Sequence, residues 1–104
     1  MHIAVRQYHI NPRNVAEVTQ RVQDGFIPLL RQAPGFVEYY WLNAGNGRVV
    51  SVGLFEDQAS AEASTRLAAD YVRQFVAELV RNPPEVIEGE VLLHAGGASR
   101  ERGA

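Results

Sequence analysis

The chain has 104 residues, of which 46% are hydrophobic and 21% are charged, and its formal net charge is −2 at pH 7. This length allows one domain with a single core, and the near-neutral charge argues against binding to nucleic acid or to an anionic membrane surface. The chain contains no cysteine, which excludes disulfides and thiolate chemistry and is typical of a cytoplasmic protein. No apolar run approaches about 18 residues, so we expect neither a membrane span nor a signal peptide.

The first third of the chain predicts a strand followed by a helix. Residues 2–10 alternate between two largely apolar faces, as in a strand with both sides covered. Apolar residues then recur at helical spacing over residues 15–30, and Asn14 is the expected N-cap. Gly25 and Pro28 lie inside this pattern, so we expect the helix to kink or partly break near residues 25–28.

A β-hairpin is predicted next. Residues 36–43 and 48–55 are rich in aromatic and β-branched side chains, and the residues between them are Asn, Ala and Gly. Neither strand alternates cleanly between apolar and polar residues, as a hairpin with one face in water would. Both faces of this hairpin therefore need cover.

The last third predicts a second helix and a last strand. Asp57 is the expected N-cap of a helix over residues 58–81, whose first half is rich in Ala and Ser and whose second half is bulky. Two prolines end this helix, and residues 85–94 form the expected strand. Residues 96–104, small and charged, predict a flexible C-terminal tail.

The order of these elements predicts the fold class. Strand, helix, strand, followed by strand, helix, strand, is the split βαβ of a ferredoxin-like α+β domain, here over residues 1–95. Such a domain has an antiparallel four-stranded sheet with both helices on one face. Nothing else in the chain can cover the other face, so we expect a homodimer through it, burying roughly 800 Å² per partner.

Two short segments carry a resemblance to a known family: Pro34-Gly35-Phe36 before the aromatic strand, and Phe55-Glu56-Asp57 before the Ala-rich helix. In these segments and in the order of its elements, the chain over residues 3–94 resembles the antibiotic biosynthesis monooxygenase family. The resemblance implies a dimeric α+β barrel. That family includes cofactor-independent oxygenases, haem-degrading enzymes, quinol oxygenases and members with no assigned activity, and the fold does not choose among them. The haem-degrading branch has an Asn, a Trp and a helical His, whereas residues 58–81 contain no His, which disfavours haem degradation.

The cofactor-independent oxygenases of this family bind an electron-rich aromatic substrate, deprotonate it and let the carbanion react with oxygen. Such a site needs an apolar slot with a few polar groups that hold a phenolate. The residues of suitable type are His9, Asn43 and Tyr71 as candidate catalytic groups, and Tyr39, Trp41, Arg66 and Arg73 as candidate substrate-binding groups. Each also has a structural interpretation: the aromatic residues as core, the histidine and the arginines as solvated surface. No metal or cofactor is expected, since the chain has no His-x-x-x-His spacing and no strand-to-helix GxGxxG.

Two functional hypotheses stay open at this level, and whether the chain is an enzyme stays uncertain. The first is a cytoplasmic, cofactor-independent monooxygenase of a small aromatic or quinol-like compound bound between helices and sheet. The second is a non-catalytic dimeric α+β barrel that binds a small ligand or serves as a stress-related assembly module. An enzyme requires a cavity between helices and sheet into which candidate residues point.

Overall fold

The structure, a computed structural model, describes residues 1–80 and 83–97. Its strands are β1 (His2–His9), β2 (Phe36–Gly45), β3 (Arg48–Phe55) and β4 (Glu85–Glu90). Its helical elements are the 3₁₀ turn η1 (Pro12–Asn14), α1 (Val15–Arg21), the π-helical turn η2 (Val22–Phe26), α2 (Ile27–Arg31), α3 (Gln58–Tyr71) and the π-helical turn η3 (Val72–Val76).

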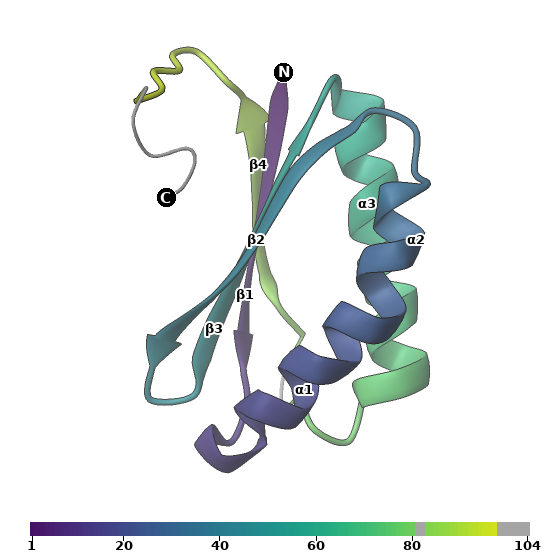
Figure 1. Cartoon of the computed structure of the whole chain (residues 1–104), viewed down its shortest axis with the longest axis vertical. Coiled ribbons are helices and arrows are strands. Elements are labelled where there is room, and N and C mark those ends of the chain that lie inside the picture. The colour runs from purple at the N-terminus through teal and green to yellow at the C-terminus, as the bar shows by residue number, and fades with distance from the viewer. Residues whose placement is uncertain (81–82, 98–104) are drawn as a thin grey trace.

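The four strands form one antiparallel sheet in the order β2-β3-β1-β4, and the helices all lie on one face of it (Figure 1). This confirms the predicted ferredoxin-like α+β fold. Cross-strand pairing places Trp41, Ser51, Arg6 and Val86 in one row across the sheet. Because paired residues point to the same side, the first three of these side chains share the face that the helices cover.

Both long helical segments are interrupted by a π-helical turn. In the first, η2 lies between α1 and α2 and Pro28 occupies the first turn of α2, which confirms the predicted break. Asn14 holds the predicted N-cap position of α1, but its side chain makes no capping bond. The turn η1 precedes α1, and there the Asn11 side chain accepts from the Arg13 N–H.

The second helical segment begins as expected and ends earlier. Asp57 caps α3 by accepting from the Ser60 N–H at 2.8 Å. The regular α-helix stops at Tyr71, and η3 follows it. The π-helical turn shifts the periodicity, so that Val76 is buried while Phe75, which regular helical spacing from Tyr71 would turn inward, is exposed.

Strand β4 ends at Glu90, four residues before the predicted end. It pairs with β1 from Glu85 to Glu90, and beyond this only the Val91 N–H bonds to the Met1 carbonyl. Residues 91–97 carry no regular secondary structure. Most of the expected tail, residues 98–104, lies outside the described residues.

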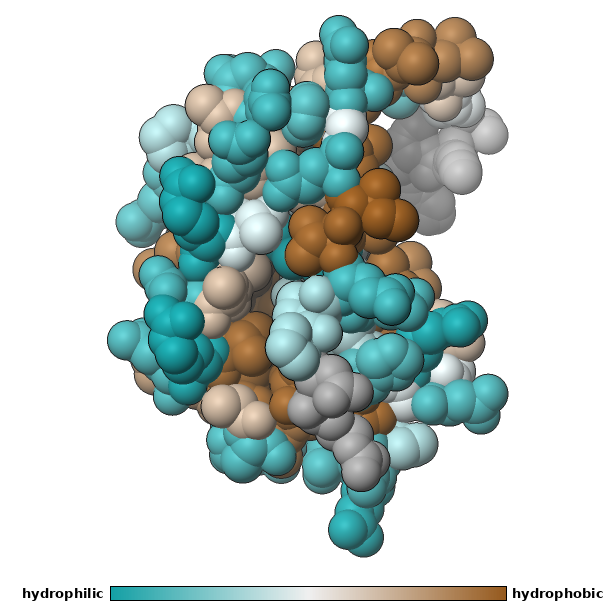
Figure 2. All heavy atoms as spheres, turned by 180° about the vertical axis from the view of Figure 1, so that it is seen from behind, coloured by the Kyte–Doolittle hydropathy of each residue, from teal (hydrophilic) through white to brown (hydrophobic). Residues whose placement is uncertain are grey.

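The sheet face opposite the helices is apolar and uncovered. It exposes Tyr40 and Ile87, and the segment after β4 exposes Leu92 and Leu93, which are 88% and 90% accessible. A groove of about 530 Å³ runs between the sheet and this segment. Figure 2 shows hydrophobic residues, in brown, in this segment and along the side away from the helices. No helix among residues 1–80 and 83–97 is long and apolar enough to cross a membrane.

Candidate functional site

The helices and the sheet enclose a small cavity between them. Its wall combines aliphatic side chains with five aromatic ones: Tyr8, Phe26, Tyr39, Trp41 and Tyr71. Its volume is about 20 Å³, which is room for a single water molecule. In this structure the cavity is therefore a small aromatic pocket without room for an aromatic ligand.

The aromatic wall is held by ring contacts and one long-range hydrogen bond. The Phe26 ring lies 5.9 Å from that of Tyr39 and 5.7 Å from that of Tyr71, in tilted arrangements that aromatic pairs favour. The Trp41 indole N–H donates to Thr19 Oγ1 at 2.8 Å, which ties β2 to α1. The wall thus joins β1, β2 and both helical segments.

Both π-helical turns border this cavity. Val22 and Phe26 of η2, and Val72 and Val76 of η3, all line it. A π-helical turn is a local irregularity that occurs often at functional sites. Its presence on both helices, at the same cavity, marks this region as the candidate site.

Tyr71 separates the cavity from a second, outer groove. Its hydroxyl donates to the Arg21 carbonyl at 2.7 Å, and its ring packs 4.9 Å from that of Phe75. The outer groove, of about 520 Å³, lies between the two helical segments and is lined by Tyr71, Phe75 and residues of α1, η2 and α2. Gly25 allows this arrangement, since a Cβ there would lie 2.5 Å from the Tyr71 hydroxyl.

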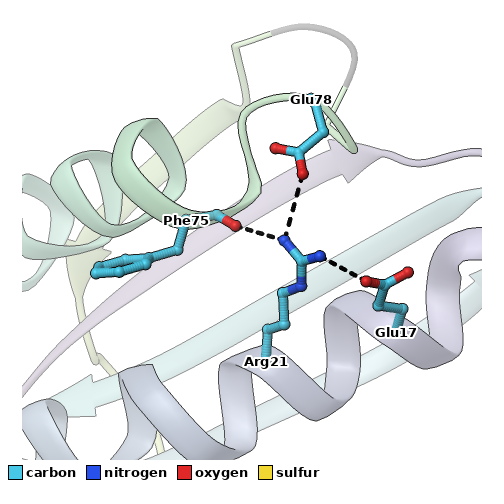
Figure 3. A network of polar contacts seen from close by, with 4 residues as sticks. All are labelled: Glu17, Arg21, Phe75 and Glu78. Atoms are coloured by element: carbon cyan, nitrogen blue, oxygen red, sulfur yellow. Dashed lines mark hydrogen bonds and ion pairs between the residues drawn. The ribbon is translucent and has the colours of Figure 1, made fainter.

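A polar network holds the two helical segments together beside this groove (Figure 3). Arg21 Nη1 donates to the Phe75 carbonyl at 2.6 Å and lies 3.4 Å from the Glu78 carboxylate. Its Nη2 pairs with the Glu17 carboxylate at 2.5 Å. These groups are exposed, so each ion pair contributes little stability, and the network chiefly fixes where the segments meet.

Of the residues predicted from the sequence, Tyr39, Trp41 and Tyr71 line the cavity together. His9 and Asn43 do lie at the same end of the sheet, as expected, but the register places them on opposite faces and both are exposed. The Asn43 side chain accepts from the Gly45 N–H at 2.9 Å within the hairpin.

The two predicted cations, Arg66 and Arg73, are exposed on the second helical segment and do not line the cavity. Arg73 pairs with Asp70 on the same segment. The roles assigned to all seven residues from the sequence stay predictions. Among residues 1–80 and 83–97, no three His, Asp or Glu side chains gather in a way that could hold a metal ion.

Sequence reasoning missed a buried polar pair beside the cavity, Arg6 and Ser51. Arg6 is 1% exposed and Ser51 is completely buried, and they are paired across β1 and β3. Arg6 Nη1 donates to Thr65 Oγ1 at 3.2 Å, and that hydroxyl donates to the Glu88 carboxylate at 2.6 Å. The available signal was the alternation of side chains along residues 2–10, which places Arg6 on the same inward face of the strand as apolar neighbours.

Two tyrosine hydroxyls lie within the electrostatic reach of this pair. Burial raises the pKa of Tyr39 to about 12, and the nearby Arg6 charge opposes the rise without overcoming it. Burial also raises the pKa of Tyr8, again against the influence of Arg6. Both phenols are therefore protonated at neutral pH and present hydroxyl groups rather than phenolates.

Comparison with known proteins gives the family. Residues 1–78 match the family model described as "Antibiotic biosynthesis monooxygenase". The chain belongs to the antibiotic biosynthesis monooxygenase family. This confirms the resemblance seen in the sequence. A comparison with curated proteins gave no match.

Solved structures share the fold of this chain at low sequence identity. A monooxygenase from the ActVA-Orf6 gene of Streptomyces coelicolor, in complex with Nanaomycin D, is 16% identical with a TM-score of 0.75, covering 93% of this chain and 92% of that one. The haem degrader MhuD of Mycobacterium tuberculosis, with two haems bound, is 17% identical with a TM-score of 0.72, covering 92% and 100%. A protein of unknown function, NE2512 of Nitrosomonas europaea, is 20% identical with a TM-score of 0.75, covering 94% and 95%.

Proposed function

We propose that this protein is a homodimeric, cofactor-independent monooxygenase that acts on a small aromatic or quinol-like compound between its helices and sheet. The observation that carries the proposal is the aromatic-walled cavity bordered by both π-helical turns. Aromatic walls with a few polar groups suit a planar phenolic ligand. The similar Streptomyces coelicolor monooxygenase, solved with Nanaomycin D, supports ligand binding by this fold.

The chemistry needs no added reductant. A phenol that loses its proton carries carbanion character on the ring, and that carbon forms a bond to one atom of O₂. Cleavage of the O–O bond then leaves that oxygen as a ring carbonyl, and the second oxygen leaves as water with two hydrogens from the substrate. The substrate supplies all four electrons, so the protein's task is to exclude bulk water and to orient the ring.

Binding requires the closed cavity to open. Pockets for small ligands measure roughly 300 Å³ or more, whereas this cavity measures about 20 Å³. Tyr71 is the side chain whose movement joins the cavity to the outer groove of about 520 Å³, since it lines both. A single hydroxyl bond to the Arg21 carbonyl holds it in place, together with its ring contacts.

The activity is tested by oxygen uptake with a panel of dihydroxyaromatic compounds. We expect uptake by wild type, and a lower kcat or a higher KM in Trp41→Phe and Tyr71→Phe. Tyr40→Phe is the matched control, because the variant keeps its ring on the opposite face of the sheet and, among the described residues, loses only a bond to Glu38. Oxygen uptake that is absent for every compound would falsify the oxygenase proposal, and uptake that is equal in all four proteins would remove the cavity as its site.

The homodimer is proposed through the uncovered sheet face. Val52 lies on the open face near the centre of the sheet, within the groove of about 530 Å³. A second copy is the partner proposed, because exposed apolar side chains gather on this face and at Leu92 and Leu93, as they do on surfaces that bind another protein. Sedimentation should give a dimer for wild type and a monomer for Val52→Glu, and a wild-type monomer at micromolar concentration would remove this part of the proposal.

The lining of the cavity, which among the described residues contains no histidine and no charged side chain, favours one alternative, a non-catalytic barrel that binds a small ligand. A binding module has no need for substrate turnover or for access by oxygen. It is distinguished by saturable binding of an aromatic ligand without oxygen uptake or product.

A further inference from the structure

We propose that Arg6 and Ser51 form an oxyanion site that anchors a ligand through two adjacent oxygens sharing one negative charge, as in an aromatic carboxylate. The site lies beside the cavity, in the row of the sheet that Arg6 and Ser51 share with the cavity residue Trp41. The inference rests on the proposed function in one respect, namely that the ring of the ligand occupies the cavity. It adds the charge and shape of the group that the ligand carries.

The first step is the cost of burying Arg6. A buried charge is strongly unfavourable unless a counter-charge and hydrogen bonds compensate it. Arg6 is 1% exposed, and among the described residues no carboxylate forms an ion pair with it. Glu88 reaches it only through the Thr65 hydroxyl. The free protein thus holds a buried cation without a direct counter-ion.

The second step is the inventory of donors. Nη1 is committed to Thr65, while Nε and Nη2 of Arg6 and the Ser51 hydroxyl make no well-formed hydrogen bond among the described residues, although the Tyr39 hydroxyl lies close to Arg6 and Ser51 and the Tyr8 hydroxyl lies close to Arg6. Buried polar atoms are nearly always bonded, so three orphaned atoms in one place call for a missing acceptor. Buried Ser64 is a contrast, because its hydroxyl donates to the Ala61 carbonyl at 2.7 Å.

The third step is the shape of the free edge. Nε and Nη2 lie on the same side of the planar guanidinium, where their N–H groups point in parallel as a fork. This fork matches two oxygens that share a charge, as in a carboxylate, and such bidentate bonds are among the strongest in proteins. Ser51 stands between the fork and Trp41 in the same row, so its hydroxyl can donate to the same group.

The fourth step is the charge of the groups that surround the site. The hydroxyls of Tyr8 and Tyr39 lie near Arg6, and both stay protonated at neutral pH because burial raises their pKa values. Both residues also line the cavity. A ligand whose ring replaces part of their packing would therefore meet a cation and neutral donors, a setting that favours an anion.

The test is a binding experiment on the whole protein, with benzoate, tropolonate and benzamide as probes. Benzoate presents two adjacent oxygens of a carboxylate that share one negative charge. Tropolonate presents two adjacent charged oxygens on its ring and has no carboxylate. Benzamide resembles benzoate in shape but is neutral. We expect calorimetry to show at least roughly tenfold tighter binding of the two anions than of benzamide, the loss of one charge-assisted bond. The side-chain Nε–H resonance of Arg6 should shift on saturation with benzoate.

Four variants assign the binding to these residues. Arg6→Lys keeps the charge and removes the fork, and Ser51→Ala removes one donor; we expect roughly tenfold and several-fold weaker benzoate binding. Arg48→Lys, an exposed arginine on the same sheet, and Ser64→Ala, a buried serine with its own acceptor, should leave the affinity unchanged. If Arg6→Lys fails to fold, Ser51→Ala and the wild-type resonance decide.

The outcomes separate this inference from the proposed function. Anion binding that depends on Arg6, without oxygen uptake, supports the site and removes the oxygenase. Oxygen uptake with no preference for anionic probes removes the site and leaves the oxygenase standing. An Arg6 Nε–H resonance that no probe moves means that only water satisfies the guanidinium, and this overturns the inference.

Discussion

Replacing Gly25 with Ala tests whether Tyr71 is held where the structure places it. Gly25 lies in η2 and its φ is not positive, so the backbone itself accepts alanine. The added Cβ would lie 2.5 Å from the Tyr71 hydroxyl oxygen and 3.0 and 3.1 Å from two ring carbons. The Tyr71 ring must therefore move, and its bond to the Arg21 carbonyl must lengthen or break.

Effects of opposite sign determine how much Gly25→Ala changes the free energy of unfolding. Alanine is preferred over glycine in a helix by about 1 kcal/mol. Against this stand the lost hydroxyl bond, about 1 kcal/mol, and the displacement of a packed ring, roughly 1–3 kcal/mol. Movement of the ring also disturbs its contacts with Phe26 and Phe75, which adds to the cost. We expect Gly25→Ala to lower the free energy of unfolding by about 1–3 kcal/mol.

Urea denaturation of a double-mutant cycle measures this coupling. In a Tyr71→Ala background the clash is gone, so Gly25→Ala should reverse sign and stabilise by up to about 1 kcal/mol. Ala63→Gly, on the exposed side of α3, calibrates the helix preference in this protein. A Gly25→Ala variant that is more stable than wild type, with Tyr71 present, would refute the reasoning.

Three further predictions follow from single contacts. Burial raises the pKa of Tyr39 from its ordinary 10.0 to about 12, so Tyr39 contributes stability below pH 10 that is lost as the pH rises toward 12; Tyr39→Phe should reduce the alkaline loss in a pH series of thermal melts, and an unchanged alkaline limb would count against this contribution. The bond from the Ser60 N–H lowers the pKa of Asp57, so Asp57 contributes stability above its ordinary pKa of 3.8 that is lost as the pH falls below that value. Asp57→Asn still caps the helix but does not titrate, so it should reduce the loss of stability at acid pH in the same series of melts. An unchanged loss at acid pH would count against the capping bond. Thr19→Val removes the acceptor of the Trp41 indole and should cost about 1–2 kcal/mol in urea denaturation, and a neutral result would show that the indole N–H finds another partner.

The fold was predictable because its signals are local and periodic. Each element has its own pattern in the sequence: alternation in residues 2–10, the Asn-Gly turn of the hairpin, and apolar residues at helical spacing. The order of these elements is compatible with few topologies. The uncovered sheet face was predictable for the same reason, since the apolar residues on both faces of the hairpin are visible in the sequence. Family membership followed from the segments that end and begin these elements.

The site was less predictable because it depends on packing between distant segments. The π-helical turns shift which residues face the sheet, so Val76 replaces Phe75 in the core. Hydrogen bonding to a carbonyl fifty residues away decides the position of Tyr71. Arg6 was passed over because an arginine in a strand is usually at the surface, and only the register shows that it is enclosed beneath α3.

The two zones beneath the helices explain why a charged site and an aromatic cavity can adjoin. The first half of α3 carries small residues, Ala61 and Ser64 among those buried, and it packs closely over the part of the sheet that contains Arg6. Its second half and η3 carry bulkier residues around the cavity. Natural sequences depart from the most stable choice mainly where function requires it, and Arg6 is such a departure, since an apolar residue would fill its place at lower cost. The Arg6–Ser51–Trp41 row crosses the boundary between the zones. A ligand with an anionic end and an aromatic ring is the kind of molecule that would use both zones at once.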